Sequence, residues 1–260
     1  MGRTQLRATE ILEGATKYTA PARRQQVDVE TARTFLNQTI AKDQSPIYRG
    51  VDEGHEDFYT ISPAGFSRQS ANTANYTTLF VDNSPAWQAY PKRSQSIICT
   101  SSRRMGASYA FGGALYRVLP KNGSKIGVCP EDDFWGSFPK LKTIGISSIE
   151  ELNFTLRDLW RGYTNYDDGR LEEKDFPTLI KQLDQLSNIL EKHGTARQKG
   201  FLKHGSIVKT LEACLDPAAN GFELMSIEQF SVTDEREVWT DATSLMVRVH
   251  VYDALEQGEI

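Results

Sequence analysis

The chain has 260 residues, of which 39% are hydrophobic and 10% aromatic, so it can bury a core and lies outside the composition of disordered or collagen-like chains. Its formal net charge of −4 gives no overall field that would recruit nucleic acid or an anionic membrane. The 3 cysteines are widely separated and form no CxxC pair, which argues against a disulfide framework or a zinc ribbon and favours a reducing compartment.

Membrane, metal and common nucleotide motifs are not apparent in the sequence. No apolar run approaches the roughly 20 residues that span a bilayer, and the first residues lack the apolar core of a secretory signal. The 4 histidines show neither HxxxH nor HExxH spacing. Neither GxGxxG nor GxxxxGK[ST] occurs, which argues against a Rossmann dehydrogenase and a P-loop NTPase. We therefore expect a cytoplasmic protein with no membrane or metal partner.

Most of the chain outside one helical block is expected to form strands and loops. The first 44 residues are expected to be an N-terminal arm, polar over 1–26, followed by an amphipathic helix over 27–40. The stretch 52–93 has no steady period and is expected to be loop with short helical turns, whereas the small residues of 106–113 favour a helix. Apolar runs or alternating patterns bounded by turn residues predict strands over 47–50, 96–100, 115–119, 126–129, 222–227, 236–239 and 245–251.

Between these strands, residues 148–217 change to a period of 3.6, which predicts three helices. The first opens on the capping-box pattern Ser148-x-x-Glu151, the second ends at Gly194 and the third ends before Pro217. Strands on both sides of a helical block imply an α+β fold. We therefore expect one catalytic domain over 45–260, with a helical insertion at about 148–217.

A first candidate motif is Arg49-Gly50 at the end of a predicted strand. An arginine can bind a diphosphate through two parallel hydrogen bonds, and a glycine lets a ligand approach the backbone closely. A second is Cys99-Thr100-Ser101-Ser102 at the end of an apolar strand. Its hydroxyl groups could orient a catalytic side chain. Taken singly, the first motif also fits a surface ion pair and the second a helix N-cap.

A third candidate motif is Glu235-Arg236-Glu237. Side chains alternate along a strand, so Glu235 and Glu237 are expected on one face, with two carboxylates side by side. That arrangement is unfavourable unless a cation or a reaction uses it, although a solvated edge strand is the simpler alternative.

Taken in order, these residues resemble the arginine, serine-threonine-serine and glutamate-x-glutamate signature of mono-ADP-ribosyltransferases of the bacterial-toxin and phage type. The segment 48–50 is similar to the first-strand arginine motif of that family, and 97–101 is similar to its apolar strand that ends in hydroxyl residues. The segment 222–238 resembles its strand, target-recognition turn and catalytic strand. The resemblance covers about 45–251 and implies a split mixed or antiparallel sheet of ADP-ribosyltransferase type with an inserted helical subdomain.

The resemblance implies a role for each motif in cleaving NAD. Glu237 would stabilise the positive charge that develops on the ribose, while Glu235 would position and deprotonate the nucleophile, an arrangement that accompanies arginine acceptors in the family. Arg49, beside Gly50, would anchor the phosphates. The hydroxyl groups at the end of the second motif would hold Glu237 in place, and we assign this to Thr100 and Ser101.

Two positions in this assignment leave alternatives open. The leading serine of the family motif falls on Cys99, whose thiol is a poor hydrogen-bond donor, unless the register shifts by one residue to begin at Thr100. Phe111 is placed to stack on the cationic nicotinamide ring, but it also fits ordinary core packing. Four basic residues flank the same strand and could attract phosphates or simply form a solvated rim: Lys92, Arg93, Arg103 and Arg104.

The sequence therefore predicts a glycosyltransferase that uses NAD as substrate, releases nicotinamide and transfers ADP-ribose to a macromolecule, with a protein arginine favoured and nucleic acid left open. It would act in the cytoplasm of the producing cell or of a target cell, as a toxin or phage effector. An NAD glycohydrolase is the nearest alternative, because it differs only in using water. A non-catalytic interaction protein with a degenerate NAD pocket is the other, and Cys99 is its best support.

Overall fold

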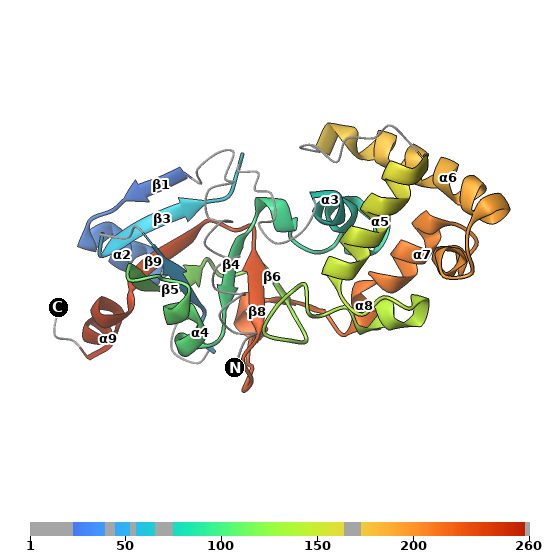
Figure 1. Cartoon of the computed structure of the whole chain (residues 1–260). Helices are drawn as coiled ribbons and strands as arrows, with labels where there is room; N and C mark the ends of the chain where they lie inside the picture. Colours follow the sequence, from blue (N-terminus) through green and yellow to red (C-terminus); the bar gives the residue numbers. More distant parts are fainter. Residues whose placement is uncertain (1–22, 40–44, 53–55, 66–74, 164–172, 258–260) are drawn as a thin grey trace. The chain divides into compact units, whose positions relative to one another are not determined.

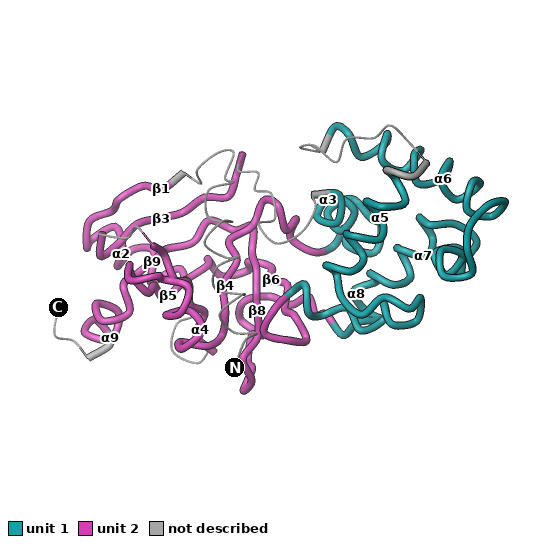
Figure 2. Tube along the Cα trace, in the orientation of Figure 1, with its two compact units in different colours: residues 1–19, 68–89, 134–221 teal, residues 20–67, 90–133, 222–260 magenta. Residues whose placement is uncertain are grey.

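The protein is described from a computed structural model, which covers residues 23–39, 45–52, 56–65, 75–163 and 173–257. Contacts between its Cα atoms divide the chain into two compact units (Figure 2). The first unit comprises Met1–Thr19, Arg68–Ala89 and Phe134–Gly221, and the second comprises Ala20–Ser67, Tyr90–Asp133 and Phe222–Ile260.

The second unit contains the β-sheet (Figure 1). Its strands are β1 (Arg23–Gln26), β2 (Tyr48–Val51), β3 (Phe58–Ser62), β4 (Ile97–Thr100), β5 (Ala114–Pro120), β6 (Lys125–Val128), β7 (Glu223–Ser226), β8 (Glu237–Thr240) and β9 (Ser244–Arg248). Their order in the sheet is β1-β3-β9-β5-β2-β4-β8-β6-β7, and every neighbouring pair of described strands is antiparallel.

The sheet is divided at the boundary between β2 and β4. Along most of the sheet, neighbouring strands pair over four or five residues, as β2 does with β5 and β4 with β8. Across the boundary, the register of the described strands joins only Tyr48 and Thr100. Two half-sheets therefore meet at a single residue pair, and β2 and β4 are free to diverge beyond it.

Apolar side chains fill both faces of the sheet. One face carries a core cluster that includes Tyr116, Val118 and Met246 from one half-sheet and Cys99 and Val238 from the other. The opposite face packs against two helices, α2 (Val29–Leu36) and α9 (Val249–Gln257). A short helix, α4 (Arg103–Ser108), packs on β2, β4 and β5 and so covers the boundary between the half-sheets.

The first unit is helical. Its helices are α3 (Asn75–Asn83), α5 (Ile149–Tyr163), α6 (Phe176–His193), α7 (Ile207–Cys214) and α8 (Pro217–Asn220), with 3-10 turns η1 (Pro85–Trp87), η3 (Pro139–Ile144), η4 (Glu173–Asp175) and η5 (Gln198–Leu202). Two further 3-10 turns belong to the other unit, η2 (Arg93–Gln95) and η6 (Ile227–Gln229). Four leucines of α6, at 179, 183, 186 and 190, are buried at helical spacing, as the sequence period predicts.

The expected α+β character is confirmed at the level of a mixed chain with an antiparallel sheet and a group of helices. The helical block begins as predicted, with the Ser148 hydroxyl accepting a hydrogen bond from the Glu151 amide at 3.1 Å. The Glu151 carboxylate, however, accepts from the amide and hydroxyl of Ser147, one residue earlier than a capping box requires.

Four predicted segments differ from the structure. The expected loop at 52–93 contains β3 and α3. The expected strand at 245–251 ends at Arg248, and α9 follows, because Val251, Tyr252 and Leu255 pack on the sheet with helical spacing. The expected helix at 106–113 is α4, which starts earlier because the Ser102 hydroxyl caps it by accepting from the Met105 amide. Within the expected arm, 23–26 forms β1, and 1–22 lies outside the described residues.

Candidate functional site

The three candidate motifs lie on three neighbouring strands of the sheet. Arg49 belongs to β2, the hydroxyl motif ends β4, and Glu237 begins β8, and these strands are adjacent in that order. The register places Thr100 opposite Tyr48 on one side and opposite Glu237 on the other. Segments distant in the sequence therefore converge at the boundary between the two half-sheets.

The pleat of the strands decides which members of these motifs share a face. Directly paired residues of an antiparallel sheet point to the same side, so Thr100 and Glu237 share one face. Cys99 pairs with Val238 on the other face, and both side chains are buried in the core cluster there. Of the residues that could fill the leading hydroxyl position, Thr100 is therefore on the side of Glu237, and Cys99 is not.

Glu237 forms a nearly buried ion pair with Arg93. Its Oε1 lies 2.5 Å from Nη2 of Arg93, and the two side chains are only 12% and 4% exposed. Arg93 also lies over the ring of Trp239, two residues along β8 on the same face, at 5.8 Å from the ring centroid. The Glu237 amide donates to Glu131 and its carbonyl accepts from Cys129. Both the main chain and the carboxylate of Glu237 are therefore fixed.

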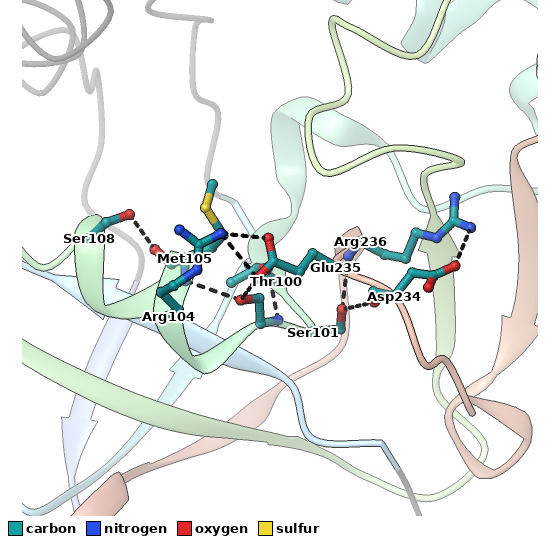
Figure 3. Close-up of polar contacts among 9 residues, drawn as sticks. Thr100, Ser101, Arg104, Met105, Ser108, Asp234, Glu235 and Arg236 are labelled. Carbon is teal, nitrogen blue, oxygen red and sulfur yellow. Dashed lines mark hydrogen bonds and ion pairs between the residues drawn. The ribbon is translucent and has the colours of Figure 1, made fainter. Parts of the chain in front are cut away.

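Glu235 lies just before β8 and is held by the start of α4 (Figure 3). The Ser102 hydroxyl donates to its Oε1 at 2.8 Å, and Nη2 of Arg104 lies 3.2 and 3.0 Å from its two oxygens. The hydrogen bond from Ser102, followed by that from Arg104, lowers the pKa of Glu235 below its ordinary value. The ionised form of Glu235 is thus stabilised, and its carboxylate binds a cationic side chain, that of Arg104.

The Thr100 and Ser101 hydroxyl groups of the second motif bind the main chain, whereas Ser102 binds the Glu235 carboxylate. The Ser101 hydroxyl donates to the carbonyl of Asp234 at 2.9 Å and accepts from the amide of Arg236 at 2.8 Å (Figure 3). The Thr100 hydroxyl accepts from the amide of Ser102 at 3.1 Å. Ser101 thereby fixes the main chain on both sides of Glu235.

Arg49 and Gly50 occupy different surroundings. Nη1 of Arg49 donates to the carbonyl of Ile98 in β4 at 2.6 Å, so its guanidinium reaches across the boundary between the half-sheets. A Cβ at Gly50 would collide with the backbone of Gly106 and Ala110, so this glycine admits α4 and the turn after it rather than a ligand. Because successive strand residues alternate, Arg49 leaves β2 on the face opposite to Gly50. The structure thus brings Arg49 to β4 but starts its side chain from the face opposite to Thr100 and Glu237.

Phe111 lies in the turn between α4 and β5 in an uncommon conformation. Its φ is 47°, the one positive value among the non-glycine residues that the structure describes, and its side chain is 45% exposed. A bulky residue in the left-handed region is strained, and such strain is concentrated at functional sites. Exposure argues against the core-packing alternative for this ring.

The sequence did not predict two ion pairs of the site: Arg93 with Glu237, and Arg104 with Glu235. The only signal was the cluster of basic residues around β4. Within the described part of the chain, no group of three or more His, Cys, Asp or Glu could hold a metal ion, and no helix is long and apolar enough to cross a membrane.

Comparison of the chain with protein-family models, with curated proteins and with solved structures found no match.

Proposed function

We propose that the protein is an NAD-dependent mono-ADP-ribosyltransferase with its reactive centre at the boundary between the half-sheets. The observation that carries the proposal is the adjacency of β2, β4 and β8, which places Thr100 between Tyr48-Arg49 and Glu237. The proposal includes the finer fold assignment, a split sheet of ADP-ribosyltransferase type, which the single residue pair between β2 and β4 supports.

In the proposed reaction, the bond between nicotinamide and C1′ of the ribose breaks, and nicotinamide leaves with the bonding electron pair. Positive charge develops on the sugar, as in the oxocarbenium state of glycoside hydrolysis. The Glu237 carboxylate would stabilise this charge, because it is fixed through its main chain and through Arg93 and needs little reorganisation. Phe111 would stack on the nicotinamide ring. Arg49 would contact the diphosphate after its guanidinium leaves the Ile98 carbonyl, since its side chain starts from the face opposite to Glu237.

The acceptor nitrogen then attacks C1′, and its proton passes to solvent or to the Glu235 carboxylate. A guanidinium acceptor suits Glu235, because a stable carboxylate binds this group well. Its lowered pKa favours positioning the acceptor over taking its proton, so we assign Glu235 mainly to binding. The proposed acceptor is accordingly a protein arginine. We also propose that the protein acts in a cytoplasm, as the sequence predicts.

The test is incubation of the wild type with labelled NAD and a cell lysate, following nicotinamide release and label on macromolecules. Glu237→Gln is expected to lower both by at least about 100-fold, because it removes the charge that stabilises the transition state. Glu223→Gln, which neutralises an exposed glutamate of the same sheet, is the matched control and is expected to match the wild type. Thermal unfolding of both variants verifies the fold.

Three other outcomes decide between the alternatives. Nicotinamide release without label on any macromolecule would favour an NAD glycohydrolase. Neither signal in the wild type would contradict an enzymatic role and favour an interaction protein. Retention of more than a few per cent of the activity in Glu237→Gln would overturn the assignment of this residue.

A further inference from the structure

A guanidinium already occupies the carboxylate to which we assign the acceptor. Nη2 of Arg104 contacts both oxygens of Glu235, and the Ser102 hydroxyl binds one of them (Figure 3). The two charged side chains are 78% and 41% exposed, so the pair lies at the surface, where an external side chain can reach it. An arginine from another protein would need the same oxygens.

We propose that Arg104 occupies the acceptor position at Glu235 in the free protein. The guanidinium of the incoming acceptor arginine must then displace Arg104 from the Glu235 carboxylate. This inference rests on the proposed function and deepens it, because it specifies how the acceptor position is regulated. Arg104 belongs to the first turn of α4, and Ser102 is the N-cap of this helix, so one local element both orients Glu235 and competes for it.

The neighbouring arginines do not compete for Glu235, because each contacts a different carboxylate. Arg103, the adjacent residue of α4, lies 3.5 Å from Asp253, and Arg236 lies 3.3 Å from Asp234. Arg103 is also exposed and carries the same charge, so it provides a matched control for charge alone.

Competition from Arg104 should be modest. Exposed ion pairs are weak, because solvent screens them and two long side chains must be ordered, so displacement costs little. Removal of Arg104 is therefore expected to lower the KM for a guanidine acceptor by about two- to fivefold.

The experiment measures steady-state transfer from NAD to agmatine, a small alkylguanidine, by the wild type, Arg104→Gln, Arg104→Lys and Arg103→Gln. Arg104→Gln is expected to show the full fall in the KM for agmatine. Arg104→Lys keeps the charge but loses the planar guanidinium, so its KM should fall less. Arg103→Gln should leave the KM unchanged. A titration with agmatine in the absence of NAD, followed by the chemical shifts of backbone amides near Glu235, measures displacement without catalysis.

The results separate this inference from the proposed function. An unchanged or higher KM in Arg104→Gln, with transfer intact in the wild type, would overturn the inference alone. An equal fall in Arg103→Gln would assign the effect to net charge and would also overturn it. A wild type that releases no nicotinamide contradicts the proposed function, whereas tighter agmatine binding by Arg104→Gln in the titration would still support displacement at Glu235.

Discussion

The ion pair between Arg93 and Glu237 should contribute more to stability than any surface pair of the protein. Arg93→Met keeps most of the side-chain volume and removes the guanidinium that pairs with the Glu237 carboxylate, which is 12% exposed. Breaking a buried pair by removing one partner costs about 3–5 kcal/mol, because the remaining charge is desolvated and uncompensated. Glu237→Gln should cost less, about 1–3 kcal/mol, because its amide oxygen can still accept from Arg93.

The double variant carries the decisive information. With both charges removed, no buried charge is left uncompensated, so Arg93→Met/Glu237→Gln should be more stable than Arg93→Met alone. The assay is urea unfolding followed by tryptophan fluorescence, because Trp239 lies beside Arg93 and reports on this part of the sheet. A thermal scan should show a fall of roughly 6 to 20 °C for Arg93→Met.

Additive losses in the double variant would refute this reasoning, because independent effects would mean that the two side chains do not stabilise one another. A loss below about 1 kcal/mol in Arg93→Met would refute it too, since that is the range of exposed pairs.

Two more substitutions test the sheet. The Tyr59 hydroxyl is buried and makes no hydrogen bond with any described residue, and burial raises its pKa to about 12. A raised pKa stabilises the fold below pH 10, and this contribution is lost as the pH rises toward 12. Over that interval Tyr59→Phe should lose about 2–3 kcal/mol less than the wild type, as urea unfolding at stepped pH would measure; burial also raises the pKa of Tyr116, so some loss remains. Destabilisation by Tyr59→Phe at pH 7 would mean that the hydroxyl is satisfied. Gly50→Ala should cost about 3 kcal/mol by thermal unfolding, because its methyl group collides with the backbone of α4 and of the turn after it; a neutral result would contradict the close approach of α4.

Sequence patterns predicted the strands that are short apolar runs, such as β4 and β6, because a buried strand needs apolar residues on both faces. They failed at β9, where alternation continues past the strand end and conceals the helical spacing of Val251, Tyr252 and Leu255. They also failed at β3, whose five residues stand in a long polar stretch.

For the candidate site, the sequence could identify the residue types but not their pairing. Strand alternation predicted that Glu235 and Glu237 share a face of one strand, but β8 begins at Glu237 and Glu235 lies before it. That Arg104 contacts one and Arg93 the other depends on the register of β4 against β8 and on the path of the chain through η2 and α4, which no local pattern encodes. Likewise, Gly50 is required by a helix that packs on its strand, and the sequence did not predict that contact.

The order of the strands has a consequence for biosynthesis. β8 and β9 lie inside the sheet, but among the described elements they follow the whole helical stretch of 134–221 in the sequence and are synthesised after it. Until they emerge, β3 lacks its link to β5, and β6 lacks its link to β4. Domains generally fold as units during synthesis, so the helices can form before β8 and β9 join the other strands into one sheet. Glu235 and Glu237 emerge together at the start of β8, so a nascent chain lacks the proposed reactive centre until β8 has left the ribosome.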